Sequence, residues 1–395
     1  MSTVLEINSH DRQSKGILGR HSLDSIKRPL TKIYIEPTTV CNLKCRTCIR
    51  NSWDETIGSM DLTIYRKLLS DLREFPSLHT MAFWGIGEPL THPEIVNMVA
   101  LAHEMGLKTE VITNGHLLDK DVARGFIEAG LDTLVVSLDG TTQTSYEAIR
   151  LGGNLMCVDE NIKEMNMMRA KMCRKNPVVG LEFVIMKSNI DQIPYLAEKA
   201  RLMEASFIVL SNLLPCTEDM KDEILYWIPG TFGNEQERPF LVPDLILPRM
   251  DMHAEYLSPL QSLLERLNRC MPEVRKRDIP EEYCPFIQKG SAAVTWSGDV
   301  SPCIPLMHSH KCYVMGREKF IKRHLVGNVK QEKMADIWNK KNYREFRKQV
   351  IKFDFPPCMH CGGCDYVETN EEDCLRNIHP VCGDCLWPKS ILLCL

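Results

Sequence analysis

The stretch that decides the fold is EPTTVCNLKCRTC, residues 36–48, which follows a short β-rich run at Lys32–Glu36. It places Cys41, Cys45 and Cys48 at CxxxCxxC spacing on one short loop. Three thiolates this close can converge on one metal site, and thiolates are the usual ligands of a four-iron cubane. A cubane held by three cysteines keeps one iron open, and an open position distinguishes a catalytic metal site from a closed structural one. Zinc with a fourth ligand from elsewhere is the alternative for this spacing alone.

The chain around this loop alternates short β-rich runs with longer helical stretches. The expected strands are Lys32–Glu36, Thr80–Trp84, Lys108–Ile112, Thr133–Ser137, Gly180–Met186 and Ser206–Ser211. The expected helices are Leu62–Glu74, Pro93–Met105, Asp119–Ala129, Glu160–Arg174 and Ile190–Met203. Such alternation indicates βαβ units and a parallel sheet, and six units are too few for a closed eight-stranded barrel. We therefore predict an α/β fold, a partial (β/α)6 barrel with its chemistry at the carboxyl ends of the strands.

Four segments follow from this pattern. We expect residues 1–30 to be a flexible lead-in, 31–215 to be the barrel, and 216–283 to be a linker or cap. Residues 284–395 should form a small, cysteine-rich α+β domain. Leucines recur at helical spacing in the linker and predict an amphipathic helix over Met252–Cys270.

Composition narrows the class of protein. The net charge of -4 argues against a nucleic-acid binder held by bulk electrostatics. The chain has no apolar run of membrane-spanning length, and its first residues lack the apolar core of a signal peptide. We therefore expect a cytoplasmic protein without a membrane partner. In a reducing compartment, 17 cysteines indicate metal binding or catalysis rather than a disulfide framework.

Ten of these cysteines crowd into the last part of the chain, where repeated CxxC pairs are a strong metal signal. Ten exceed by two the eight that two four-thiolate sites need. Between the first two, residues 293–300 predict a hairpin with a glycine turn at Gly298. Cys312 is either an extra ligand or a free thiol. The candidate ligands are Cys284, Cys303, Cys358, Cys361, Cys364, Cys374, Cys382, Cys385 and Cys394. Two zinc ribbons are the alternative.

Over Lys32–Pro215 the chain resembles the radical S-adenosylmethionine superfamily. The resemblance rests on the cysteine loop and on turns after the next three strands: WGIGEP at 84–89, TNG at 113–115 and VSLDG at 136–140. It implies that Cys41, Cys45 and Cys48 hold a redox-active 4Fe-4S cluster. A low-potential electron donor of ferredoxin or flavodoxin type would reduce it. S-adenosylmethionine would then be cleaved to methionine and a 5′-deoxyadenosyl radical, which abstracts hydrogen from a substrate.

The same resemblance implies a set of contacts to S-adenosylmethionine. Glu88 and the turn backbone would hold the methionyl ammonium, with Gly87 permitting close approach. Ser137 and Asp139 would bond the ribose or methionyl carboxylate region, and Arg150 would pair with that carboxylate. A plain turn and a solvated helix end are the alternatives for Asp139 and Arg150. Thr47 stands where the family often has an aromatic residue, and the backbone near Leu213 would lie against the adenine. The full set of implied contacts is Thr47, Gly87, Glu88, Asn114, Ser137, Asp139, Arg150 and Leu213.

The last third resembles SPASM domains, which carry auxiliary 4Fe-4S clusters. Cys284, Gly298 and Cys303 match the opening Cys-x(9–15)-Gly-x4-Cys pattern, and residues 327–338 resemble the connecting segment. The later spacing departs from the usual pattern, because Cys364 comes early and Cys374 late. The resemblance implies two auxiliary clusters that relay electrons and leaves their ligand assignment open.

Finer details resemble one subgroup, the maturases associated with tungsten-cofactor oxidoreductases. They are CRTCIR at 45–50 with Trp53, SNLLP at 211–215, GREK at 316–319 and CGDCLW at 382–387. This implies a polypeptide or pterin-type substrate destined for a tungsten enzyme. A maturase that makes thioether or carbon–carbon crosslinks in a ribosomal peptide is one alternative. A non-catalytic zinc scaffold is another, from a different class.

Overall fold

The computed structural model describes residues 28–227, 229–230, 244–270, 275–276, 282–361 and 364–393. The expected lead-in lies outside these residues up to position 27, as do Cys394 and much of the linker between 228 and 243. Within them, no helix is long and apolar enough to cross a membrane.

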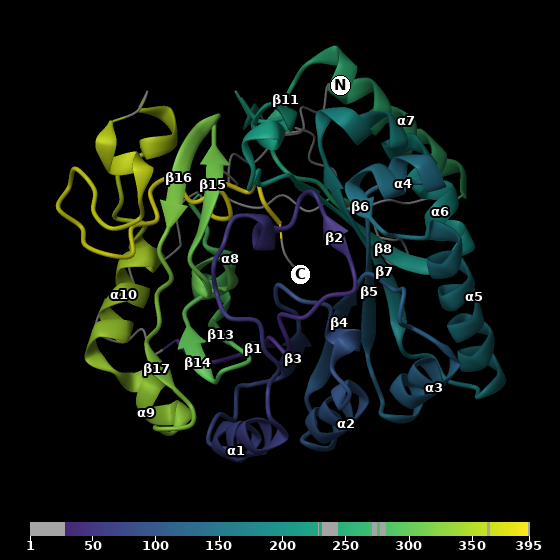
Figure 1. The fold of residues 1–395 in the computed structure, drawn as a ribbon, viewed down its shortest axis with the longest axis horizontal. Helices are drawn as coiled ribbons and strands as arrows, with labels where there is room; N and C mark the ends of the chain where they lie inside the picture. Colours follow the sequence, from purple (N-terminus) through teal and green to yellow (C-terminus); the bar gives the residue numbers. More distant parts are fainter. Residues whose placement is uncertain are drawn as a thin grey trace, which may run out of the picture.

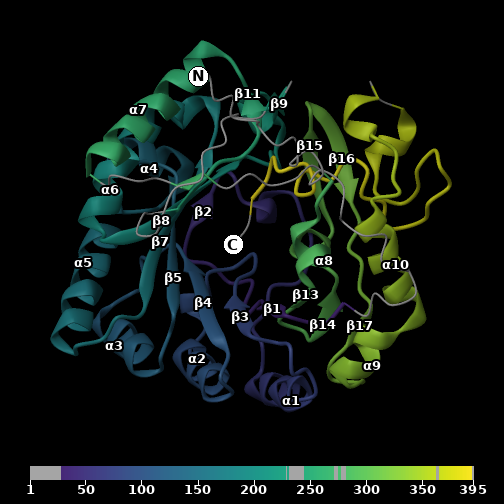
Figure 2. The same ribbon diagram turned by 180° about the vertical axis from the view of Figure 1, so that it is seen from behind.

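The six expected strands are confirmed, and they lie side by side in one parallel sheet (Figures 1 and 2). Their spatial order is that of the sequence, as in a barrel built of consecutive βα units. Each strand is almost wholly buried, which explains the near-continuous apolar runs. They are β1 (Lys32–Ile35), β3 (Thr80–Phe83), β4 (Lys108–Thr113), β5 (Thr133–Leu138), β7 (Val178–Ile185) and β8 (Ala205–Asn212).

The sheet continues beyond these six strands on both edges. In the described residues it has eleven strands, in the order β12-β10-β8-β7-β5-β4-β3-β1-β13-β14-β17. The cysteine-rich segment thus begins by adding β13 parallel to β1, before β14 returns antiparallel through the predicted Gly298 turn. The added strands are β10 (Asp244–Ile246), β12 (Arg275–Lys276), β13 (Ser291–Val294), β14 (Asp299–Ser301) and β17 (Gly327–Asn328).

Helices cover the outer face of the barrel sheet (Figure 1). They are α1 (Leu62–Leu72), α2 (Ile95–Glu104), α3 (Lys120–Glu128), α4 (Gln143–Ile149), α5 (Leu155–Lys171) and α6 (Leu196–Leu202). Helix α5 begins five residues before the expected Glu160, because the Asn154 side chain accepts from Cys157 N and caps the helix there. The expected helix Ile190–Met203 is split: Pro194 lies inside a 3-10 helix, η4 (Lys187–Tyr195), and α6 follows.

The amphipathic helix of the linker is confirmed as α7 (Ala254–Cys270), which packs on η4 and α6. The cysteine-rich part adds α8 (Pro285–Lys289), α9 (Met334–Asn339), α10 (Lys341–Lys352) and the hairpin β15 (His310–Val314) and β16 (Arg317–Ile321). One buried apolar cluster runs from barrel residues such as Phe83 to Phe346 and Val350 of α10. The barrel and the cysteine-rich part therefore share a core. The boundaries at 215 and 283 stay a prediction.

Candidate active site

The cysteine loop lies at the carboxyl end of β1 and is held by short strand pairing. Its strand β2 (Lys44–Cys45) pairs antiparallel with β6 (Arg150–Leu151), with Cys45 opposite Arg150. Inside the loop, the Arg50 guanidinium donates to the carbonyls of Leu43 (2.8 Å) and Thr39 (3.3 Å). Sequence reasoning used Arg50 only as a subgroup feature, whereas the structure shows that it fixes the shape of the loop.

The three thiols share one electrostatic environment. Burial raises the pKa of Cys41, and it raises the pKa of Cys45 to about 11, with charge on Cys48 adding to both rises. Among the described residues, no three His, Cys, Asp or Glu side chains stand close enough to hold a single metal ion. The donor set of three partly exposed thiols on one loop, with the Arg50 cation beside them, nevertheless suits an anionic iron–sulfur cluster. Binding one would release the thiol protons.

The GIGEP turn after β3 packs backbone to backbone on the residues before Cys41. A Cβ atom on Gly87 would lie 2.3 Å from the Thr38 carbonyl oxygen and 2.5 Å from that of Val40, so only glycine fits. Glu88 N donates to the same Val40 carbonyl at 2.8 Å. The turn thus supports the cysteine loop directly. This gives Gly87 a structural role in addition to the predicted one, which is to let the backbone approach the cofactor closely.

Glu88 is fully buried and ties three loops together. Its carboxylate accepts hydrogen bonds from Thr113 Oγ1 (2.6 Å), Asn114 N (2.7 Å) and Leu90 N (3.0 Å). Asn114 in turn donates from Nδ2 to Asn42 Oδ1 at 2.8 Å, next to Cys41. Burial raises the pKa of Glu88, and these donors oppose the rise. Two predicted cofactor contacts therefore form one network with the cysteine loop, and their contact with the methionyl group stays a prediction.

Asp139 and Arg150 form a buried ion pair, Arg150 Nε to Asp139 Oδ2 at 2.8 Å. The alternative of a solvated helix end for Arg150 is therefore wrong, because its side chain is only 9% exposed. Nearby, Ser137 Oγ donates to Glu182 of β7 at 3.4 Å. Burial and the Asp139 charge raise the pKa of Glu182 to about 7. Sequence reasoning missed Glu182. The available signal was a carboxylate inside the otherwise apolar predicted strand Gly180–Met186.

The remaining two predicted contacts are Thr47 and Leu213. Thr47 is partly exposed on the cysteine loop. Leu213 is buried, and its backbone is already engaged: N–H donates to Ile185 O, and the carbonyl accepts from the Tyr226 hydroxyl. A backbone contact from Leu213 to the adenine stays a prediction.

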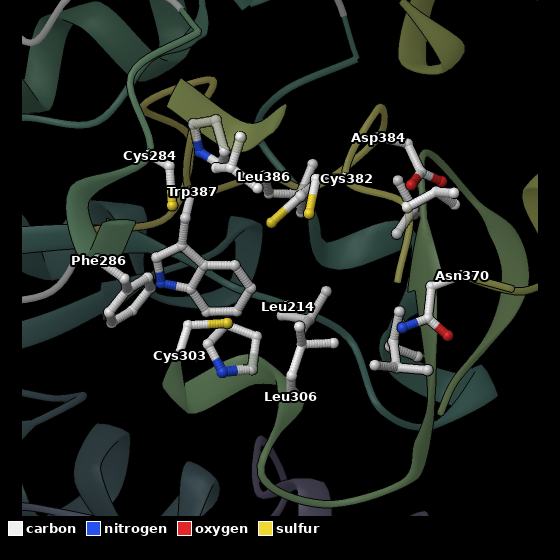
Figure 3. A pocket seen from close by; sticks show the side chains of 18 of the residues that line it. Leu214, Cys284, Phe286, Cys303, Leu306, Asn370, Cys382, Asp384, Leu386 and Trp387 are labelled. Atoms are coloured by element: carbon white, nitrogen blue, oxygen red, sulfur yellow. The ribbon is translucent and has the colours of Figure 1, made fainter. Parts of the chain in front are cut away.

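Four of the C-terminal cysteines line one apolar cavity of about 70 Å³, together with Cys312. Figure 3 shows Cys284, Cys303 and Cys382 around Trp387 and Leu386. Burial raises the pKa of Cys385 to about 12, and charge on Cys284 adds to the rise. The residues of this first group are Cys284, Cys303, Cys382 and Cys385, and four thiols around one apolar space suit a closed cluster.

A second group forms around Cys358, which lies near Cys374. Burial raises the pKa of Cys358 to about 11, with Asp384 and Cys374 adding to the rise. Cys361, Cys364 and Cys374 are exposed. Gly383 connects the groups, because a Cβ atom there would be 2.4 Å from the Pro356 carbonyl and 3.3 Å from Cys358 Sγ. The chain between Cys382 and Cys385 thus passes directly beside the second group.

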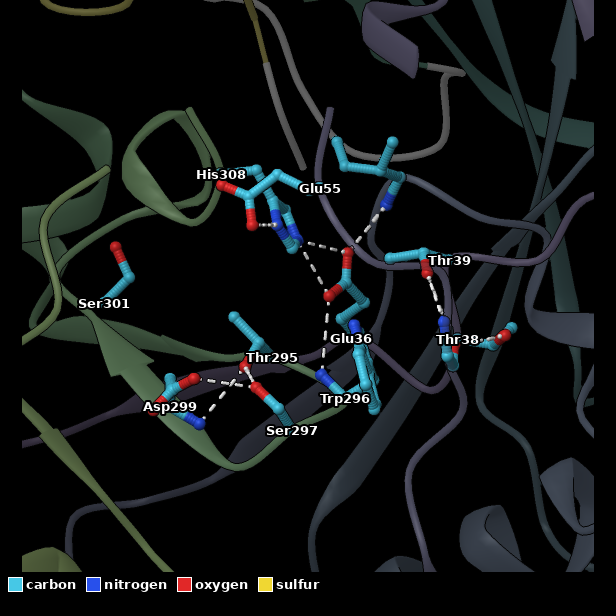
Figure 4. Close-up of polar contacts among 12 residues, drawn as sticks. Glu36, Thr38, Thr39, Glu55, Thr295, Trp296, Ser297, Asp299, Ser301 and His308 are labelled. Carbon is cyan, nitrogen blue, oxygen red and sulfur yellow. Dashed lines mark hydrogen bonds and ion pairs between the residues drawn. The ribbon is translucent and has the colours of Figure 1, made fainter. Parts of the chain in front are cut away.

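One buried polar contact between the two parts of the protein was missed by sequence reasoning. Glu36, at the end of β1, accepts from His308 Nε2 at 3.0 and 2.9 Å (Figure 4). It also accepts from Ile86 N and Trp296 N. The position of Glu36 at the carboxyl end of a barrel strand was a signal, but nothing in the sequence pointed to His308 as its partner.

Comparison with known proteins agrees with this architecture. A sequence model of the radical SAM superfamily matches residues 35–191, and one of the iron–sulfur cluster-binding SPASM domain matches residues 284–365. The tungsten-containing aldehyde ferredoxin oxidoreductase cofactor-modifying protein of Pyrococcus furiosus is 31% identical over 366 residues, 92% of this chain and 96% of that protein. The PqqA peptide cyclase of Gluconobacter oxydans is 25% identical over 91% of this chain and 92% of its own length.

Solved structures share the fold. Streptococcus suis SuiB bound to S-adenosylmethionine has a TM-score of 0.57 at 16% identity, covering 85% of this chain and 71% of SuiB. The enzyme anSMEcpe, with bound S-adenosylmethionine and a peptide, has a TM-score of 0.56 at 17% identity, covering 92% and 96%. The predicted partial barrel with a SPASM-type extension is confirmed.

Proposed function

Because this chain belongs to the radical SAM superfamily, in the branch that carries a SPASM domain, we propose that it matures the cofactor or polypeptide of a tungsten-containing oxidoreductase. A radical SAM enzyme holds a 4Fe-4S cluster and S-adenosylmethionine, which together supply a 5′-deoxyadenosyl radical when bound. The tungsten assignment rests on the subgroup motifs and on the cofactor-modifying relative, which matches this chain along nearly its whole length.

The observation that carries the proposal is the linkage of three cofactor-type turns to the cysteine loop. Gly87 and Glu88 bond or pack on Val40, and Asn114 bonds to Asn42 beside Cys41. The buried Asp139–Arg150 pair lies on the other side, where Arg150 is opposite Cys45. These groups are pre-organised, so they hold the loop in place without reorganisation when a cofactor binds.

In this proposal Cys41, Cys45 and Cys48 hold the catalytic cluster, and Arg50 offsets its negative charge. Thr47, Ser137 and the backbone near Leu213 contact the nucleoside part of the cofactor. Cys284, Cys303, Cys382 and Cys385 hold one auxiliary cluster. Cys358, Cys361, Cys364 and Cys374 are the candidates for a second, and Cys394 lies outside the described residues.

A peptide maturase is the second candidate, and the near full-length similarity to a peptide cyclase favours it.

We also propose the division into a barrel (31–215), a linker or cap (216–283) and an auxiliary domain (284–395). The same holds for a cytoplasmic location without nucleic-acid or membrane partners, and for a ferredoxin- or flavodoxin-type electron donor.

Anaerobic turnover tests the proposal. The reconstituted protein, given dithionite and S-adenosylmethionine, should form 5′-deoxyadenosine and methionine in equal amounts. Adding a purified apo tungsten oxidoreductase with its free pterin should raise that rate and change the mass of the protein or the pterin. A rate raised instead by a small cysteine-rich peptide would assign the crosslinking function. No cleavage in protein with a full first cluster would contradict both.

A further inference from the structure

A groove of about 670 Å³ lies between the barrel and α9 and α10, on the side of the β3 amino end. The residues that follow α1, among them Phe75 and Pro76, form one wall, and the two helices form the other. Five cations and two anions line it, an excess of three positive charges on a chain whose net charge is -4. The groove is therefore a local reversal of the overall charge, which favours an anionic partner.

Three of the cations that line the groove are exposed residues of α10. Lys341, Arg344 and Lys348 are exposed and follow one another at i, i+3 and i+7, so they share one face of the helix. None of the three forms an ion pair within the part of the chain that the structure describes. The wall's Glu74, by contrast, pairs with Lys333 at 3.3 Å. Like charges on adjacent helical turns repel, and a bound anionic surface would relieve that repulsion.

The opposite face of the same helix lines the auxiliary cavity. Phe346 and Val350 contact the space that contains Cys284, Cys303, Cys382 and Cys385. Positions 344 and 346 are two residues apart, which turns the side chains to opposite sides of a helix with 3.6 residues per turn. One helix, about 10 Å across, thus separates the basic groove from the four thiols.

Aromatic side chains fill the space between the two. The Arg347 guanidinium lines the groove and stacks 3.9 Å from the centroid of the Trp338 ring and 4.2 Å from that of Tyr343. Both rings are buried, Trp338 at 5% and Tyr343 at 0% exposure.

We propose that this groove docks a small acidic one-electron carrier protein, which reduces the auxiliary cluster behind α10. One electron leaves the reduced iron–sulfur centre of the carrier, enters the cluster held by Cys284, Cys303, Cys382 and Cys385, and passes on to the cluster held by Cys41, Cys45 and Cys48. The carrier is oxidised by one electron, the catalytic cluster is reduced by one, and no bond or proton is exchanged in these transfers. The inference rests on the proposed function, because it needs that cluster.

The test uses reconstituted full-length holoenzyme and an acidic 2(4Fe-4S) ferredoxin, reduced beforehand, as the sole electron source. The measurement is 5′-deoxyadenosine formation as a function of ferredoxin concentration. The double variant R344E/K348E reverses two groove charges. The control R174E/K175E makes the same change in net charge at exposed residues that follow α5. Figure 1 shows α5 and α10 at opposite sides of the molecule.

We expect R344E/K348E to raise the KM for ferredoxin about tenfold or more and to flatten its salt dependence, because steering by charge is lost. The control should match wild type. Dithionite is small and needs no docking surface, so dithionite-driven cleavage and iron content should be close to wild type in both variants. The milder variant R344Q/K348Q should have a KM for ferredoxin between those of wild type and R344E/K348E. It replaces R344E/K348E in the test if the charge-reversed protein fails to fold.

An unchanged KM for ferredoxin in R344E/K348E, with dithionite-driven cleavage intact, would overturn the docking surface and leave the proposed function standing. A groove variant that instead changes oligomeric state by light scattering would assign the groove to a second copy of the chain and would also overturn it. Failure of dithionite-driven cleavage in wild type would overturn the proposed function itself.

Discussion

The Nε2 atom of His308 lies 3.0 and 2.9 Å from the two carboxylate oxygens of Glu36 and joins the auxiliary part of the protein to the first barrel strand. Glu36 also accepts from two backbone N–H groups, so it is the acceptor and Nε2 carries the proton. The other ring nitrogen, Nδ1, is buried, has no hydrogen bond among the described residues and faces Glu55 at 3.8 Å. His308 and Glu55 both line a cavity of about 230 Å³.

A double-mutant cycle should show that this contact couples the two parts of the protein. Glu36→Gln, His308→Asn and the double variant, compared by urea unfolding, should give a coupling free energy of about 1–3 kcal/mol. The reason is that either single change leaves a buried polar partner unsatisfied. Additive effects of the two changes would show that the contact contributes nothing of its own.

Glu88→Gln should weaken the network around the cysteine loop. The amide group of glutamine presents N–H groups where the carboxylate accepts three hydrogen bonds, so at least one donor loses its acceptor. We expect a loss of about 1–3 kcal/mol in the free energy of unfolding of the apoprotein. Thr113→Val removes one donor to Glu88 and also the acceptor of Gly115 N, so it should destabilise the apoprotein as well. A Glu88→Gln variant as stable as wild type would contradict the role of Glu88 in bracing these loops.

Gly87→Ala should disturb the cysteine loop by steric contact alone. The added methyl group would meet the carbonyls of Thr38 and Val40 well inside van der Waals distance, and neither is a flexible side-chain end. Overpacking of this kind costs about 1–3 kcal/mol. Reconstitution should then yield less iron in the catalytic cluster, measured per chain, while the auxiliary sites fill normally. Wild-type iron content and stability would show that the turn does not support the loop.

Glu182 should make stability depend on pH. Its folded-state pKa of about 7 lies above the ordinary value of 4.5, so between these values the folded protein keeps a proton that the unfolded chain has lost. Stability should therefore fall as pH rises through that window, by at most about 3 kcal/mol. Apoprotein carrying Glu182→Gln should lack this component of the fall. Thermal unfolding at pH 5 and pH 8 measures it, and identical pH profiles for variant and wild type would contradict the assignment.

The fold could be predicted largely from the sequence, because a parallel sheet requires local apolar runs that alternate with helical periodicity. What the sequence did not reveal depends on contacts between distant segments. Strand β13 has no local feature that marks it as the neighbour of β1. The paired residues Lys32 and Ser291 are 259 positions apart in the sequence. The continuation of the barrel sheet into the cysteine-rich part therefore emerged only from the structure.

The candidate site shows the same division. The spacing of Cys41, Cys45 and Cys48 and the turn motifs are local, and sequence reasoning found them. The sorting of the later cysteines is not local, because Cys284 and Cys385 share a cavity although a hundred residues separate them. Polar networks such as Glu88 with Thr113, or Glu36 with His308, also depend on which strand ends meet, which spacing does not specify.

The most direct test of the central claim is EPR spectroscopy of the anaerobically reconstituted protein, with and without S-adenosylmethionine, alongside iron and sulfide counts. Three clusters predict about twelve irons per chain with matching sulfide, and a spectrum that changes when S-adenosylmethionine is added. The variant C41A/C45A/C48A should keep about eight irons and lose that change. About three zinc ions with little iron, or a spectral change that survives in the triple variant, would contradict the assignment of Cys41, Cys45 and Cys48 as the ligands of the catalytic cluster.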